Sequence, residues 1–177
     1  SIERVRLGSL EPEQLSEAVI ARLSQQKKLC PQFHLSLQSG CDETLKRMNR
    51  HYDTQEYRTI VKNLRAAFAN AAITTDMMVG FPGETEDEFQ QSLSFAKVHV
   101  FAYSRRPGTI ANDSPNQVVQ AVKEQRSRLL IEATQATKLT FFKEQLGFTE
   151  PVLFERECEK GVYEGYTENY TPVKARS

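Results

Sequence analysis

The sequence has no long hydrophobic run, no excess of charge of either sign and few cysteines. No apolar stretch approaches the ~20 residues of a transmembrane helix, so no membrane-spanning segment is expected. Lys and Arg together number 23, as do Asp and Glu, and this balance argues against bulk electrostatic binding of nucleic acid, leaving room only for a local basic patch. The first residues lack the basic and apolar regions of a signal peptide.

The three cysteines, Cys30, Cys41 and Cys158, lie far apart. Without a Cys-x-x-Cys pair, the chain is not expected to build a zinc or iron–sulfur site from its own residues. The odd, sparse count also argues against a disulfide framework. We therefore interpret the cysteines as ordinary thiols of a protein in the reducing cytoplasm.

The composition is that of a globular protein, with 39% hydrophobic and 26% charged residues. A length of 177 residues suits one domain, or one domain and part of another. The chain begins with Ser1 and not with Met, which favours a piece of a longer protein.

Strand-like and helical patterns alternate along most of the chain. Strands are predicted over residues 4–7, 33–37, 73–79 and 98–103, and a helical pattern follows each of them. Two helices begin at capping boxes, one formed by Asp53 and Glu56 and the other by Thr85 and Glu88. A long helix is predicted over residues 116–146, with an apolar stripe formed by Val119, Val122, Leu129, Ala133, Ala136 and Phe141.

Four β-then-α units in series predict an α/β protein with a parallel sheet. A closed barrel of eight units takes ~250 residues, so a partial (β/α) barrel or an open doubly wound sheet remains. A partial barrel would leave the edge strand of its parallel sheet exposed, which a complete protein rarely tolerates. This again favours a missing N-terminal portion. Near Lys97 almost no residues are left for a loop, so either the preceding helix ends near Ser92 or residues are absent there.

The pattern changes after Thr149. Strands predicted over residues 151–156, 161–166 and 171–175, with no helix between them, indicate the start of a small antiparallel β-domain. We therefore divide the chain into an α/β domain over residues 1–146, which ends with the long helix, and a partial β-domain over residues 147–177.

Ligands of parallel α/β folds bind at the carboxyl ends of the strands, where this chain gathers Gly, Ser, Gln, Glu and Arg. Gln38 and Ser39 offer donors and acceptors for sugar hydroxyls or a carboxylate. Arg105 and Arg106 suit a carboxylate or a phosphate. Each feature has a plainer interpretation, since Gly-Phe-Pro-Gly suits any strand-to-helix turn, Glu84 and Thr85 suit a helix cap, and paired arginines suit a solvated surface.

Asp76 is unusual because it lies in an apolar strand, where a carboxylate needs a partner. That partner is either a ligand hydroxyl or a basic group of a neighbouring strand. His34 and His99 also lie in strand patterns, and we interpret both as half-buried side chains with local partners. No phosphate-binding loop, nucleophilic triad or metal-ligand cluster is visible in the sequence.

Four segments in this order resemble the methylthiotransferase branch of the radical S-adenosylmethionine (SAM) enzymes. They are residues 34–41 (HLSLQSGC) with 45–52 (LKRMNRHY), residues 75–85 (TDMMVGFPGET), residues 99–109 (HVFAYSRRPGT) and residues 164–170 (EGYTENY). The last segment resembles part of the TRAM domain, the small RNA-binding β-barrel of that family. With Ser36 and Cys41 at these positions, the sequence is most similar to the subgroup that acts on threonylcarbamoyladenosine in tRNA. Related branches of the family act on isopentenyladenosine or on a ribosomal protein.

The resemblance implies a partial radical SAM barrel and a transferase that adds a methylthio group to C2 of a modified adenosine. It implies SAM and two [4Fe–4S] clusters in the full-length protein, together with an electron donor. The cluster motif Cys-x₃-Cys-x₂-Cys is absent here, so the fragment is expected to bind no cluster and to be inactive, and no catalytic residue or metal ligand is assigned. The residues that match the SAM-binding positions are Gln38, Ser39, Asp76, Gly80, Phe81, Pro82, Gly83, Glu84, Tyr103, Ser104 and Arg106.

The resemblance also implies a tRNA partner, bound through its anticodon loop. The side chains predicted to meet it, by charge and by base stacking, are Lys46, Arg47, Arg50, Arg105, Tyr166 and Tyr170. Two alternatives stay open: a non-catalytic RNA-binding module, and a related radical enzyme with another nucleoside or a protein as its substrate.

Overall fold

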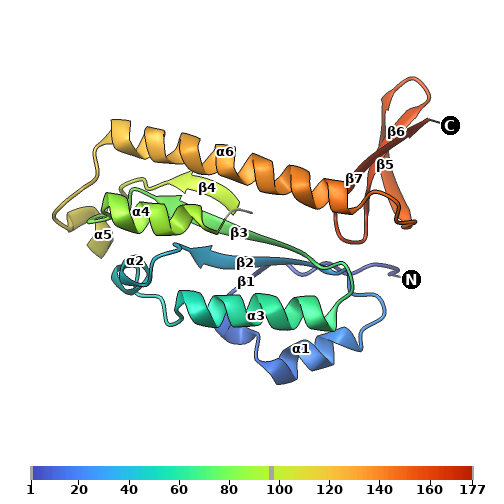
Figure 1. The fold of residues 1–177 in the computed structure, drawn as a ribbon, viewed down its shortest axis with the longest axis horizontal. Coiled ribbons are helices and arrows are strands. Elements are labelled where there is room, and N and C mark those ends of the chain that lie inside the picture. The colour runs from blue at the N-terminus through green and yellow to red at the C-terminus, as the bar shows by residue number, and fades with distance from the viewer. Residues whose placement is uncertain (1, 96–97, 177) are drawn as a thin grey trace.

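A four-stranded parallel sheet forms the centre of the protein in the computed structural model, which describes residues 2–95 and 98–176 (Figure 1). The strands lie in the order β1 (Ser9–Leu10), β2 (Gln32–Gln38), β3 (Ala72–Val79) and β4 (Val98–Ala102). The helical elements are η1 (Pro12–Gln14), α1 (Glu17–Ser24), α2 (Asp42–Arg47), α3 (Thr54–Ala67), α4 (Glu86–Leu93), α5 (Ile110–Asp113) and α6 (Gln120–Glu144). This is the predicted series of four βα units.

The prediction was wrong at the first unit. The strand expected over residues 4–7 makes only an isolated bridge between Val5 and Leu29, and β1 instead begins at Ser9. The first ladder pair between β1 and β2 joins Ser9 to His34, two residues into β2. The helix expected from Pro12 is split into η1 and α1, and the short helix α5 was not predicted.

Both predicted capping boxes are present. The side chains of Asp53 and Thr85 accept the amide N–H groups of Glu56 and Glu88, whose carboxylates accept the cap amides in return. The helix α4 ends at Leu93, close to the end near Ser92 that was one of the two alternatives from the sequence. Lys97 itself lies outside the described residues.

The hydrophobic core lies between the sheet and the helices α3 and α4. Phe33, Leu35 and Leu37 of β2 are fully buried there, together with Leu64 of α3 and Phe89 of α4. Successive strand residues point to opposite faces, so the intervening residues of β2 and β3 point to the other face of the sheet, which we call the inner face. The inner face carries polar side chains.

Among the residues that the structure describes, no helix is long and apolar enough to cross a membrane.

Two buried tyrosines make the folded state sensitive to alkali. Burial raises the pKa of both Tyr52 and Tyr57 to about 12, whereas an exposed phenol ionises near 10. Between these values the folded state holds more protons than the unfolded state, so stability falls as pH rises from about 10 to about 12, by up to about 3 kcal/mol for each tyrosine.

We expect the double variant Tyr52→Phe with Tyr57→Phe to lose less stability than the parent between pH 9 and pH 11 in urea unfolding. Tyr163→Phe, which changes an exposed tyrosine near the C-terminus, is the matched control and should keep the parental pH dependence. An unchanged pH dependence in the double variant would show that neither phenol is linked to folding.

The apolar stripe predicted for the long helix was wrong. The residues that α6 buries are Lys123, Arg126 and Leu130. Of the predicted stripe, Val122, Ala133 and Phe141 are half-buried, whereas Val119, Leu129 and Ala136 are exposed. The helix turns Lys123 and Arg126 inward because each has a hydrogen-bond partner in the loops beyond β3 and β4.

The C-terminal residues form a separate antiparallel sheet of β5 (Val152–Glu159), β6 (Val162–Thr167) and β7 (Pro172–Arg176), as predicted. This sheet, here called the β-module, is fastened to the rest of the chain. The side-chain amide of Asn169 donates to the carbonyl of Asn70 at 3.3 Å and to Oε1 of Gln145 at 2.9 Å. Arg4 donates to the carbonyl of Pro151 at 3.2 Å. The domain boundary at residues 146 and 147 stays a prediction.

Candidate functional site

The loops beyond the carboxyl ends of β2, β3 and β4 lie at one end of the sheet and form what we call the rim. At the end of β2, Gln38 adopts a left-handed backbone conformation with φ of 70°. Ser39 is buried, and its Oγ accepts the amide N–H of Cys41 at 3.2 Å. Ser92 of α4 holds the same turn through its Oγ, which accepts the amide of Gly40 at 3.0 Å. The hydroxyl of Ser39 is therefore used within the turn.

The Gly-Phe-Pro-Gly loop follows β3 and is closed by a buried carboxylate. Glu84 Oε1 accepts the amide N–H of Gly80 at 2.9 Å and a hydrogen bond from Nη1 of Arg126 at 2.7 Å. Burial raises the pKa of Glu84, while the Gly80 amide and the Arg126 guanidinium oppose that rise. Gly80 and Gly83 both have positive φ, of 73° and 79°, a conformation that favours glycine.

Tyr103, just beyond β4, has a buried hydroxyl without a hydrogen-bond partner among the described residues. Its ring meets that of Phe81 edge to face at 5.4 Å, which joins the loops after β3 and β4. A buried hydroxyl without a partner costs about 1–3 kcal/mol, which a polar atom of a ligand can recover. This hydroxyl is therefore an unused hydrogen-bonding group of the rim.

Two residues of the rim, Lys123 and Arg126, were not predicted from the sequence. Lys123 Nζ donates to the carbonyl of Tyr103 at 3.0 Å, and burial lowers its pKa. A signal was present, because Lys123, Arg126 and Leu130 follow the spacing of one helix face. Because Lys123 and Arg126 are charged, this face does not show the apolar stripe that marks a buried helix face.

The remaining predicted SAM contacts are divided between the rim and its surroundings. Pro82 is buried within the loop, and Ser104 and Arg106 are exposed beyond β4. Asp76 lies within β3, and its Oδ2 is 3.2 Å from Nε2 of His34. Its partner is thus a basic group of the neighbouring strand, one of the two alternatives open from the sequence.

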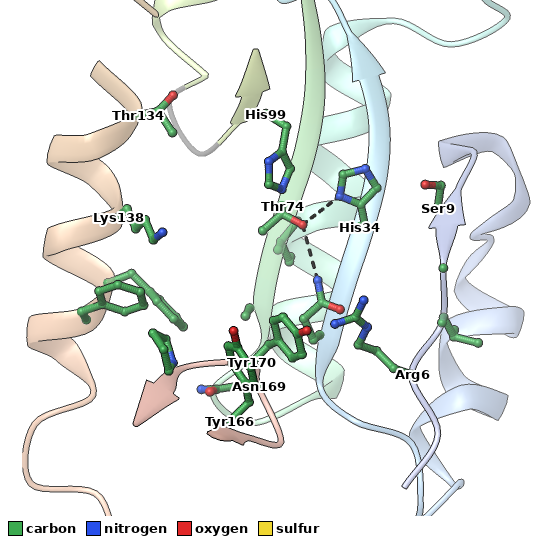
Figure 2. Close-up of a pocket in the computed structure, with 18 residues that line it drawn as sticks. Arg6, Ser9, His34, Thr74, His99, Thr134, Lys138, Tyr166, Asn169 and Tyr170 are labelled. Carbon is green, nitrogen blue, oxygen red and sulfur yellow. Dashed lines mark hydrogen bonds between the residues drawn. The ribbon is translucent and has the colours of Figure 1, made fainter. Parts of the chain in front are cut away.

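The two histidines lie together on the inner face (Figure 2). The His34 and His99 rings are 5.6 Å apart, and His34 Nδ1 lies 2.9 Å from Thr74 Oγ1. The interpretation of His34 as a half-buried side chain with local partners is confirmed, whereas His99 is exposed.

The side chains predicted to meet RNA do not form one surface. The basic ones all have partners within the chain: Lys46 pairs with Glu43, Arg47 with Glu88 and Arg50 with Glu11, and Arg105 donates to the Asn112 carbonyl. Those of α2 and the loop after β4 lie near the rim, whereas Tyr166 and Tyr170 belong to the β-module at the other end of the molecule (Figure 1). The two rings stack at 4.2 Å.

Curated relatives match almost the whole of this chain. It is 38% identical over 173 residues to the threonylcarbamoyladenosine tRNA methylthiotransferase MtaB of Thermotoga maritima, covering 94% of this chain and 40% of that protein. It is 36% identical over 166 residues to the tRNA-2-methylthio-N(6)-dimethylallyladenosine synthase of Pelotomaculum thermopropionicum, covering 90% of this chain and 37% of that protein. The chain therefore spans well under half the length of these relatives.

The fold is shared with solved radical SAM proteins. Coproporphyrinogen III oxidase from Escherichia coli superposes with a TM-score of 0.58 at 16% identity, over 78% of this chain and 32% of that chain. This likeness supports a partial radical SAM barrel over an open doubly wound sheet. The family model of the radical SAM superfamily matches residues 4–96, more than half of the sequence. The chain therefore belongs to the radical SAM superfamily.

Proposed function

We propose that this chain is part of a tRNA methylthiotransferase that adds a methylthio group to C2 of N6-threonylcarbamoyladenosine. The observation that carries the proposal is the 38% identity to the Thermotoga maritima enzyme of that name, which extends over 94% of the chain. The match includes both the α/β region and the β-module. The proposed partner is tRNA, bound through its anticodon loop in the cytoplasm.

The rim is the proposed SAM-binding site. SAM, bound beside a reduced [4Fe–4S] cluster, supplies hydrogen-atom abstraction to enzymes of this superfamily. In this chain, the loop from Gly80 to Glu84 would hold it, with Gln38 on one side and Tyr103 on the other. The fit is supported by the buried Tyr103 hydroxyl, which has no partner among the described residues, and by the tight turn that the positive φ values of Gly80 and Gly83 give to the loop.

The cysteines of this chain do not fit an iron–sulfur cluster. Cys30 and Cys41 are buried, Cys158 lies in β5, and the described residues contain no group of three side chains that could hold a metal ion. The two proposed clusters would therefore need ligands from elsewhere in a full-length enzyme, which would also need an electron donor. We propose that this chain alone is inactive, and we assign no step to a cluster here.

The test is to delete the gene that encodes this chain and to measure modified nucleosides of total tRNA by mass spectrometry. The expected result is loss of 2-methylthio-N6-threonylcarbamoyladenosine, with its unmethylthiolated precursor accumulating. Restoring the full-length gene should restore the nucleoside, whereas a Gln38→Ala version should restore it only partly. Unchanged methylthio nucleosides in the deletion strain would contradict the proposal and favour a non-catalytic RNA-binding module.

A second candidate substrate is N6-dimethylallyladenosine, also called isopentenyladenosine. It is favoured by relatives of that activity, including one from Streptomyces coelicolor at 42% identity over 154 residues. The same nucleoside analysis separates the two, because each substrate has its own 2-methylthio product. Loss of methylthiolation on a ribosomal protein, with both nucleosides intact, would instead identify a protein substrate.

A further inference from the structure

A cavity of about 630 Å³ lies on the inner face of the sheet, away from the rim (Figure 2). Its floor is formed by His34, Thr74 and His99, α6 forms one wall, and the N-terminal segment with Arg6 forms the opposite wall. Thr74 precedes Gly80 by six residues, which is about 20 Å along a strand. The cavity is therefore distinct from the proposed SAM site.

The cavity carries positive charge. Arg6 and Lys138 line it from opposite walls, and no Asp or Glu is among its described lining residues. Both cations lie on aromatic rings, with the Arg6 guanidinium 4.1 Å from the Tyr170 ring centre and Lys138 Nζ 5.5 Å from that of Phe142. Neither forms a salt bridge within the described residues, so both charges are available to an anion.

The aromatic lining suits a flat ring. Tyr166 and Tyr170 stack with their planes only 7° apart, and the planar guanidinium of Arg6 covers the other face of Tyr170, so a flat ring can extend this stack only from Arg6 or from Tyr166. Nucleobases stack on aromatic side chains and on arginine in the same way, at about 1–3 kcal/mol for each base. An anion attached to a flat base matches both features of the lining.

The third feature of the cavity lining is a buried hydrogen-bond acceptor that receives no hydrogen bond. Gln32, at the start of β2, lines the cavity and is 6% exposed, and its Oε1 has no hydrogen-bond partner among the described residues. The other end of the same amide donates to Thr74 Oγ1 at 3.4 Å, which orients the group. A ligand N–H would satisfy Oε1, and an exocyclic amine of a base supplies one.

We propose that this cavity binds a nucleotide whose base carries an exocyclic amine, with Arg6 and Lys138 balancing its phosphate and Gln32 accepting from the amine. The proposal is independent of methylthio transfer at the rim. The nucleotide is either an unpaired residue of an RNA chain or a free mononucleotide, since the two share this chemistry.

The test titrates this 177-residue chain with AMP, adenosine and IMP by calorimetry, and with a fluorescent single-stranded oligoadenylate by anisotropy. We expect AMP to bind about tenfold more tightly than adenosine, which lacks the phosphate, and than IMP, which lacks the amine. AMP binding without oligoadenylate binding would identify a free nucleotide as the ligand, and binding of both would identify an RNA residue.

Two variants test the assigned roles. Arg6→Gln with Lys138→Gln should weaken AMP at least about tenfold, whereas the matched control Arg22→Gln with Lys160→Gln removes the same charges elsewhere on the surface and should bind like the parent. Gln32→Leu should abolish the preference for AMP over IMP while thermal unfolding shows that the protein stays folded. The proposal is overturned if neither AMP nor oligoadenylate binds, if the two double variants bind alike, or if Gln32→Leu keeps the preference.

Discussion

Replacing Arg126 by leucine is expected to lower the free energy of unfolding by about 3–5 kcal/mol. Both members of the pair are buried, with side-chain exposures of 6% for Arg126 and 1% for Glu84, so the change leaves a buried carboxylate without its cation. The Arg126 guanidinium also donates to the Glu84 carbonyl and to Glu86, and these bonds are lost as well.

Urea unfolding of Arg126→Leu measures this cost, and Arg128→Leu, an exposed arginine of the same helix, is the matched control. The loss should shrink as pH falls. Without its cation, Glu84 keeps a pKa above that of the unfolded chain, so the folded state takes up the proton first and is favoured at low pH. Equal stability of the two variants at neutral pH would show that the buried pair contributes nothing net.

Gly165→Ala is expected to open the β-module and to leave the parallel sheet intact. A Cβ at this position would collide with the Leu153 carbonyl oxygen and would lie 2.6 Å from Phe154 Cα. Both are backbone atoms of the paired strand β5, and neither can rotate away. A cost of about 3 kcal/mol would speed amide exchange in β5–β7 by about two orders of magnitude.

Hydrogen exchange followed by mass spectrometry resolves the two sheets in one experiment. Peptides from β5–β7 should lose protection, and peptides from β2 and β3 should keep theirs. Gly8→Ala is the control, since an added Cβ there meets nothing within 4 Å and Gly8 lacks a positive φ. Parental protection throughout β5–β7 in Gly165→Ala would contradict the expected collision.

The features that the sequence predicted well depend on neighbours in the chain. The capping boxes at Asp53 and Thr85 need only residues three positions apart, and β2 and β3 show apolar runs that end at glycine-containing turns. The rim followed from the general rule that strand ends face one another in a parallel sheet.

What the sequence could not supply depends on partners that are distant in the chain. Arg126 is buried because Glu84, in a loop beyond another strand, needs a cation, and a helix pattern alone reads it as a surface residue. The position of Tyr166 and Tyr170, far from the basic residues of α2, depends on where the β-module folds back on Asn70. Asp76 pairs with His34 because β3 lies beside β2 in the sheet, and the position of one strand beside the other is not contained in either local pattern.

The helix α6 is held at both ends, and this makes it a rigid rod between two parts of the molecule. Lys123 and Arg126 fix its first turns to the rim, and Gln145, just past its last turn, accepts hydrogen bonds from Asn70 and Asn169. Its 25 residues span about 37 Å, and one residue more or fewer would rotate one end against the other by about 100°. The spacing and the relative rotation of the β-module and the Gly80–Glu84 loop are therefore set by the length of one helix.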